Sequence, residues 1–229
     1  MSEGRTIAIG DIHGCDVALE RVLEAVAPSA DDHLVVLGDV CDRGPNTRRV
    51  IDILIDLENR CDLLPILGNH DEMMLAVFGR LPNGNLNFWW GVGGSETIES
   101  YGGDPSAVPE SHLDFLSHAA PYLESPTDIF VHASLRGSLP LTEQSFETLR
   151  WQKVSGTEPP HPSGRRVICG HTSQRSGWPL MWDGWLCIDT RVYEPAGWLT
   201  ALDVHENVFY QANQAGQLRG PFSLEQIAP

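Results

Sequence analysis

The sequence predicts an α/β fold in which short buried strands alternate with amphipathic helices. One observation is a series of apolar runs of strand length, several of which end in glycine and a polar cluster. A second is that helical patterns separate the first three runs, an order typical of parallel βαβ units. Because ligands of open α/β sheets bind beyond the carboxyl ends of the strands, the polar clusters predict a functional site at that edge.

Six segments combine an apolar run with polar residues at its end. They are 6–14, 33–44, 63–72, 128–134, 165–172 and 185–191. Between the first three, apolar residues at helical spacing predict one helix over about 16–27, capped by Asp16. The same pattern predicts another helix over 47–59, capped by Asn46. We therefore expect the six polar clusters to meet at one edge of the fold.

The remaining segments predict loops and a C-terminal hairpin. Residues 80–103 are rich in glycine and asparagine, and we expect a single domain over 1–229 with an inserted loop and helix segment at about 80–125. Trp89 and Trp90 in this segment either wall a cleft or pack it. The last apolar runs, over 197–213, predict an antiparallel hairpin.

Composition limits the partners and the compartment. The chain carries 15 Lys and Arg against 31 Asp and Glu, a net charge of −16, which disfavours nucleic acid and anionic membranes as partners. The opening residues MSEGRTIAIGD do not resemble a signal peptide, and no apolar run approaches membrane-spanning length. Five widely spaced cysteines fit reduced thiols. We expect a cytoplasmic protein, and the sequence does not predict its oligomeric state.

Side chains that can bind metal ions end several of the predicted strands. They are Asp11, His13, Asp39, Asn69, His70, His132 and His171. This mixture of oxygen and imidazole ligands, without thiolate, suits Mn²⁺, Fe or Zn²⁺ better than Ca²⁺. Two ions about 3.5–4 Å apart need a shared carboxylate, and Asp39 on the second strand is the expected bridge. Cations would then neutralise the charges that follow the buried run LVVLGDVCDRGPN.

Five short blocks occur in a fixed order along the chain. GDIHG, GDVCDRG, GNHD, VHA and GHT lie between Gly10 and Thr172. Together they resemble the motifs of the phosphoprotein phosphatase family of the calcineurin-like metallophosphoesterases, with most similarity to the small bacterial and bacteriophage lambda-type serine/threonine protein phosphatases. The resemblance implies a central β-sandwich of mixed sheets flanked by helices.

The resemblance also implies a site with two divalent metal ions, with Mn²⁺ as the expected metal. The implied ligands are Asp11, His13 and Asp39 for one ion. For the other ion they are Asp39, Asn69, His132 and His171. The substrate phosphate would contact Asn69 as well.

Three further residues acquire catalytic roles from the resemblance. Asp42 would orient His70 as the general acid, and Arg43 would bind phosphate oxygens. A second basic contact to phosphate is assigned to Lys153, which follows Trp151 by two residues, although lysine lacks the bidentate fork of arginine and Arg150 lies nearby. Arg191 either adds charge near the site or lies on the surface.

The implied activity is that of a metal-dependent phosphomonoesterase. A hydroxide that bridges the two metals would attack phosphorus in line, and His70 would protonate the leaving oxygen. The expected substrate is a phosphoprotein or phosphopeptide with phosphoserine or phosphothreonine, and phosphotyrosine is a further option.

Two other functions stay open. GDIHGC and RGPNT also resemble the bacterial diadenosine tetraphosphatases, which would hydrolyse dinucleoside polyphosphates with the same metal site. Such an enzyme needs a nucleotide-sized groove with basic residues, and the acidic composition weighs against it. A non-catalytic phosphoprotein-binding module is the third function, and it would be favoured by a missing ligand or general acid.

Overall fold

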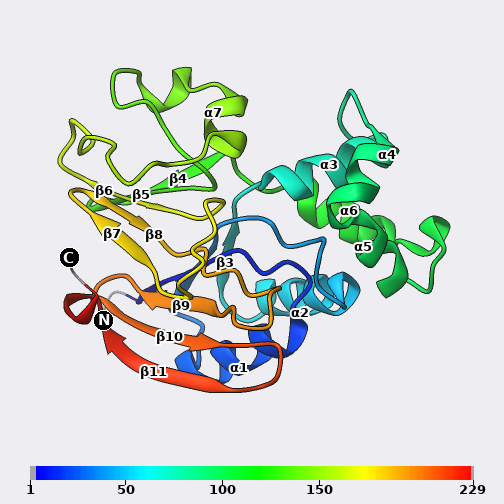
Figure 1. Cartoon of the computed structure of the whole chain (residues 1–229), viewed down its shortest axis with the longest axis horizontal. Helices are drawn as coiled ribbons and strands as arrows, with labels where there is room; N and C mark the ends of the chain where they lie inside the picture. The colour runs from blue at the N-terminus through cyan, green and yellow to red at the C-terminus, as the bar shows by residue number, and fades with distance from the viewer. Residues whose placement is uncertain (1–3, 228–229) are drawn as a thin grey trace.

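Two β-sheets pack face to face, with helices on their outer sides (Figure 1). This architecture comes from a computed structural model, which describes residues 4–227. The predicted α/β fold with two mixed sheets is confirmed. The predicted domain limits, residues 1 and 229, lie outside the described residues.

The first sheet has six strands in the order β11-β10-β9-β1-β2-β3. Its parallel part consists of β1 (Thr6–Ile9), β2 (His33–Val36) and β3 (Asp62–Pro65). The connections are α1 (Asp16–Val26) and α2 (Thr47–Glu58). The antiparallel part consists of β9 (Leu199–Asp203), β10 (Val208–Ala212) and β11 (Leu218–Ser223). The predicted C-terminal hairpin is therefore present as β9 and β10.

The second sheet has five strands in the order β4-β5-β6-β8-β7. Its parallel strands are β5 (Asp128–Val131), β6 (Arg166–Cys169) and β8 (Trp185–Cys187). The antiparallel edges are β4 (Tyr122–Glu124) and β7 (Leu180–Trp182). Between β5 and β6 the chain forms α7 (Phe146–Trp151).

The parallel strands other than the edge strand β3 are buried on both faces, which explains why they read as continuous apolar runs. Side chains alternate along a strand, so Ala8 and Phe130 point into the space between the sheets. Ile7 and Ile9 point the other way, into the cluster beneath α1 and α2. Val131 belongs to a third cluster on the outer face of the second sheet. The strand ends are thus fixed between packed layers.

The segment after β3 forms a group of helices beside the sheets, on the right of Figure 1. They are α3 (Asn69–Val77), α4 (Leu86–Trp89), a π-helical turn over Trp90–Gly94, α5 (Ser95–Ser100) and α6 (Glu110–Ser117). That residues 80–125 are an insertion into one domain stays a prediction. None of the helices between residues 4 and 227 has the length and apolar character of a bilayer-spanning segment.

The two predicted helix caps have different outcomes. Asn46 caps α2, because its side chain accepts a hydrogen bond from the backbone N–H of Arg49 at 3.4 Å. Asp16 was predicted wrongly, since it is the first residue of α1 and follows the cap position. Its carboxylate instead accepts hydrogen bonds from the side chains of Asn46 and Gln214, both at 2.8 Å.

Asp32 joins the starts of β1 and β2 to the end of α1. Its carboxylate accepts hydrogen bonds from the backbone N–H of Arg5 at 2.9 Å and from the Arg5 guanidinium at 2.7 Å. Arg5 also donates to the carbonyl of Val26 at 3.1 Å. The hydrogen bond from the Arg5 side chain holds the pKa of Asp32 well below its usual value of 3.8.

We predict that Asp32→Asn destabilises the protein at pH 7 by about 1–2 kcal/mol, a value that allows for the partial exposure of Arg5. Because the folded-state pKa of Asp32 lies below the unfolded value, its contribution is present above about pH 4 and is lost as the pH falls through the folded pKa. Urea unfolding at pH 7 and pH 3 should therefore give a smaller difference at pH 3. The same difference at both pH values would contradict this account.

Candidate metal centre and catalytic cavity

The loops that follow five parallel strands bring the predicted metal ligands together at one edge of the sandwich. The loop after β1 supplies Asp11 and His13, and the loop after β2 supplies Asp39. Asn69 and His70 begin α3, directly after β3. On the second sheet, His132 follows β5 and His171 follows β6. The carboxyl ends of the parallel strands in both sheets thus lie at the same edge of the sandwich.

The backbone turns sharply at several of these residues. φ is 46° at His13, 49° at Asp39 and 60° at His171, and Asp42 and Arg43 also have positive φ. Non-glycine residues rarely adopt this conformation, which costs about 1–3 kcal/mol each and is concentrated at functional sites. The chain also approaches itself closely, since a Cβ atom at Gly68 would lie 2.2 Å from the backbone nitrogen of Asp39. The surrounding fold therefore holds the backbone of these loops in conformations that the residues would not adopt by themselves.

The buried carboxylate of Asp39 faces two sides of the centre. Oδ2 lies 3.5 Å from His13 Nε2, and Oδ1 lies 3.4 Å from His132 Nε2. Burial acts to raise the pKa of Asp39, but the surrounding imidazoles, first that of His132, hold it below its usual value because they are protonated in the acid range where this carboxyl titrates. Two candidate metal-binding groups share this residue, namely His13–Asp39–His70 and Asp39–His132–His171. One shared carboxylate is consistent with a dinuclear site.

Three histidines have the tautomer that metal binding requires. A backbone carbonyl can only accept, so the ring nitrogen beside it must carry the proton and the other nitrogen keeps a lone pair, which on His13 accepts from Arg43 Nη1 at 2.8 Å. Such a carbonyl partner is typical of metal-binding histidines. Burial lowers the pKa of His13 and His132, and lowers that of His171 to about 4, so all three are neutral at pH 7. The donor–acceptor pairs are His13 Nδ1 to Cys41 O at 2.9 Å, His132 Nδ1 to Leu37 O at 2.7 Å and His171 Nε2 to Trp151 O at 3.0 Å.

Asn69 shows that this arrangement fits a cation. Its Oδ1 lies 3.1 Å from His132 Nε2 and 2.9 Å from His171 Nδ1. Because the protons of both rings are on the opposite nitrogens, three lone pairs face one another without a proton to share. A divalent cation bound between these atoms would remove the repulsion of their lone pairs. Oxygen with neutral imidazole is a donor set that Mn²⁺, Fe and Zn²⁺ accept.

Asp11 lies next to this centre but, among the described residues, belongs to neither group. Its two carboxylate oxygens accept from the backbone N–H of His171 at 3.2 and 3.0 Å. Burial, followed by the nearby carboxylates of Asp189 and Asp39, raises the pKa of Asp11 well above its usual value. The first group contains His70 in its place, so Asp11 as a metal ligand stays a prediction.

His70 and Asp42 form a buried pair, as the sequence predicts for an acid and its orienting residue. His70 Nδ1 lies 2.6 Å from Asp42 Oδ2, which leaves Nε2 to face the cavity. Burial acts to lower the pKa of His70, but the carboxylates of Asp39 and Asp42 raise it above its usual value. His70 therefore differs from the other histidines, because a carboxylate rather than a carbonyl supports its ring.

The helices beside the sheets hold Asp42 in place. Trp89 Nε1 donates to both carboxylate oxygens, at 3.0 and 2.9 Å. Thr97 Oγ1 donates to Oδ1 at 2.8 Å. Of the two predicted roles for the tryptophan pair, packing applies to Trp89, which is buried, whereas Trp90 is exposed. The contacts of Trp89 and Thr97 with Asp42 were not predicted, and only the presence of tryptophan beside a glycine-rich stretch hinted at them.

Four cationic side chains line a cavity of about 330 Å³ over Asp39 and His70, namely those of Arg43, Lys153, Arg175 and Arg191. The guanidinium of Arg43 lies 2.8 Å from His13 Nε2 and from His70 Nε2, and it stacks 4.6 Å from the centre of the Tyr193 ring. From the sequence we expected Arg43 and Lys153 near the substrate phosphate and left the location of Arg191 open. Arg175 was not predicted. Arg150 pairs with Glu72 at 3.0 Å instead.

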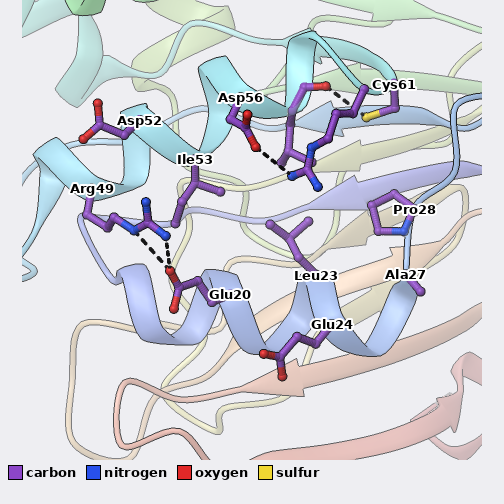
Figure 2. Close-up of a pocket in the computed structure, with 12 residues that line it drawn as sticks. Glu20, Leu23, Glu24, Ala27, Pro28, Arg49, Asp52, Ile53, Asp56 and Cys61 are labelled. Atoms are coloured by element: carbon purple, nitrogen blue, oxygen red, sulfur yellow. Dashed lines mark hydrogen bonds and ion pairs between the residues drawn. The ribbon is translucent and has the colours of Figure 1, made fainter.

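A second hollow, of about 520 Å³, lies between α1 and α2 (Figure 2). Its lining includes Pro28 and Cys61, which precede β2 and β3, so it extends toward the opposite ends of the strands. Its two cationic side chains are both paired with carboxylates of the lining, Arg49 with Glu20 at 2.7 Å and Arg60 with Asp56 at 3.2 Å. None of the metal-binding groups found among residues 4–227 lies there. We therefore assign no catalytic role to this hollow.

Comparison with protein families gives one match over most of the chain. The model of the calcineurin-like phosphoesterases matches residues 4–175. Among curated proteins, a symmetrical bis(5'-nucleosyl)-tetraphosphatase of Acidovorax sp. (strain JS42) is 45% identical over 70 residues, which are 30% of this chain. That stretch spans about a quarter of the relative, 24% of its length.

Solved structures with the same fold cover nearly the whole chain. One, provisionally named a diadenosine tetraphosphatase, has a TM-score of 0.67 and 22% identity over 92% of this chain and 94% of the other. A cold-active protein tyrosine phosphatase has a TM-score of 0.65 and 16% identity over 94% of this chain and 78% of the other. At these identities the likeness establishes the fold alone.

We predict that Asp42→Asn lowers the pKa of His70, because it removes one of the two neighbouring carboxylates that raise this pKa. NMR titration of the histidine ring protons in chelator-treated protein would measure the change. As a matched control, Asp62→Asn removes the partner of the exposed His33, 2.6 Å away, and should leave His70 unaffected. An unchanged His70 titration in Asp42→Asn would contradict this account.

Proposed function

The chain belongs to the calcineurin-like phosphoesterase family, and we propose that within it the protein hydrolyses dinucleoside polyphosphates such as diadenosine tetraphosphate. The sequence favoured a protein serine/threonine phosphatase and kept this activity as the alternative. The cavity and the named relatives support the alternative better. The lambda-type subgroup suggested by the sequence has no specific support among the comparisons.

The observation that carries the proposal is the concentration of positive charge in the cavity. Four cationic side chains meet there in a chain whose net charge is −16. A single phosphoryl group held by metal ions and Arg43 does not need three further cations, whereas a polyphosphate chain carries a charge on each phosphate. Arg175 and Arg191 also line an adjoining hollow of about 490 Å³. Glu194 lines the same hollow and pairs with Arg191 at 3.2 Å, so Arg175 is the cation that extends the positive charge beyond the reacting position.

The relatives give independent support. The symmetrical bis(5'-nucleosyl)-tetraphosphatase of Acidovorax is similar over a stretch of 70 residues, and the solved structure provisionally named a diadenosine tetraphosphatase has a similar length and fold. Because the curated match covers only 24% of that relative, the activity of this chain has to be tested directly.

We assign the metal ions, with Mn²⁺ as the first choice, to the side chains around Asp39. The remaining ligands would be His13, Asn69, His132 and His171, with Asp11 as the predicted addition. When bound, such ions would polarise phosphoryl oxygens and lower the pKa of a water molecule.

The side chains of the chain itself supply the other steps. Arg43 would bind the oxygens of the reacting phosphoryl group, and Lys153, Arg175 and Arg191 would bind the neighbouring phosphates. In this structure His70 Nε2 faces the Arg43 guanidinium, which can only donate; with Arg43 on the phosphate instead, His70 would present a proton on Nε2 to the leaving oxygen, while Asp42 keeps the ring oriented. The carboxylate of Asp42 favours the protonated ring, so activity that depends on this proton should fall as the pH rises through the pKa of His70.

The His70–Asp42 pair is the one observation that favours a protein phosphatase as the second candidate. A serine alkoxide is a poor leaving group and needs a proton, and general acid catalysis is worth roughly 10²–10⁴-fold. A nucleoside diphosphate leaves as a phosphate anion, whose last pKa is only about 6, and needs the proton much less. The assembled acid and metal-binding groups also weigh against a non-catalytic binding module.

The prediction is that the Mn²⁺-loaded protein hydrolyses diadenosine tetraphosphate with a kcat/KM at least about 10-fold above that for a phosphoserine peptide. For His70→Asn, activity on the peptide should fall by about 10²–10⁴-fold, and that on diadenosine tetraphosphate by clearly less. Steady-state kinetics with both substrates would measure this, with the exposed His118→Asn as the matched control. Turnover of the peptide alone by the wild type would reverse the order of the two candidates.

A further inference from the structure

A groove lined with aromatic residues lies between α3, α4 and α7. It encloses about 500 Å³, and its walls include Phe88 of α4, Phe146 and Trp151 of α7, and Met73 of α3. Phe88 is 52% exposed, Phe146 61% and Trp151 38%, although these are large apolar side chains. Exposed aromatic residues gathered in one hollow of this size are typical of small-molecule sites, which enclose roughly 300–1,000 Å³.

Polar contacts fix the rings in place. Glu72 accepts a hydrogen bond from Arg150 Nη1 at 3.0 Å on one carboxylate oxygen and from the indole N–H of Trp151 at 2.8 Å on the other. The Arg150 guanidinium in turn lies 4.3 Å from the centre of the Phe146 ring. The charges of Glu72 and Arg150 therefore compensate each other, and the groove presents oriented rings to an uncharged, flat occupant.

The groove adjoins the catalytic cavity. Glu72 follows His70 by two residues on α3, so their side chains leave the helix on different sides, and the direct links between groove and cavity come from α7 and the residues after it. The carbonyl of Trp151 accepts the ring N–H of His171 at 3.0 Å, and Lys153, two residues further on, lines the basic cavity. A substrate whose phosphate lies over Asp39 can thus extend into the groove.

We propose that this groove binds a nucleobase of the substrate, so that the protein selects nucleoside polyphosphates over base-free polyphosphates; this deepens, and rests on, the proposed function. A base has two flat apolar faces and a polar edge. Phe88, Phe146 and Trp151 offer stacking surfaces, and Asn83 and Asn85 in the same lining offer amide groups to the edge. Stacking of one base on aromatic side chains is worth about 1–3 kcal/mol.

The test compares the binding of AMP and ribose 5-phosphate, which differ only in the base, to the Mn²⁺-loaded protein by titration calorimetry. The wild type should bind AMP more tightly, and Phe88→Ala, Phe146→Ala and the double variant should lose this preference by about 5- to 150-fold in Kd ratio. Leu86→Ala is the matched control, since Leu86 is 51% exposed on the same helix but does not line the groove.

The binding results test the nucleobase site independently of whether the protein hydrolyses diadenosine tetraphosphate. Loss of the AMP preference in the groove variants supports the nucleobase site, even if the wild type fails to hydrolyse diadenosine tetraphosphate. An unchanged preference in the double variant overturns it, even if that hydrolysis is efficient. If the groove variants weaken turnover of a phosphopeptide but leave the AMP preference intact, the groove binds peptide and the nucleobase assignment is wrong.

Discussion

The buried carboxylate of Asp39 is the constraint on which the rest of the site depends. A charge removed from water needs close compensation, and in a protein interior it comes from a counter-charge or from hydrogen-bond donors. Asp39 receives one backbone N–H, from His70 at 2.9 Å, and otherwise faces imidazole nitrogens. Because His13 and His132 are neutral with lone pairs directed inward, cations shared among these groups are the compensation that the geometry suits.

The hydrogen-bond partner of each histidine ring distinguishes the candidate metal ligands from the candidate general acid. Backbone carbonyls of the strand-end loops hold His13, His132 and His171, so the sandwich itself sets their tautomers. A carboxylate holds His70, and that carboxylate depends on Trp89 and Thr97 from the neighbouring helices. The strand-end loops of the two sheets thus position the candidate metal ligands, while the helical segment supports the candidate acid and forms one wall of the aromatic groove.

The parallel strands could be predicted from the sequence, because buried strands read as apolar runs. The convergence of the site residues could be predicted as well, because polar residues directly follow these runs and parallel strands end at the same edge of a sheet. The edge strands β4 and β7 were not predicted, because each has three residues and none of them is fully buried, so they leave no apolar run. Trp89 and Thr97 contact Asp42 across 47 and 55 residues of chain, and no local pattern encodes such pairs. Arg175 was not predicted either, because no local pattern places it near Arg43. The net composition of the chain is acidic and does not indicate that several of its few cationic side chains line one cavity.

The most direct test of the account is the number of metal ions that Asp39 holds. Wild-type protein reconstituted with Mn²⁺, freed of excess metal and analysed by mass spectrometry should contain two ions per chain. Asp39→Asn should lose at least one of them while circular dichroism shows an unchanged fold, because one carboxylate serves both candidate groups. One ion or none in the wild type, or two ions retained by Asp39→Asn, would contradict a centre built around this residue.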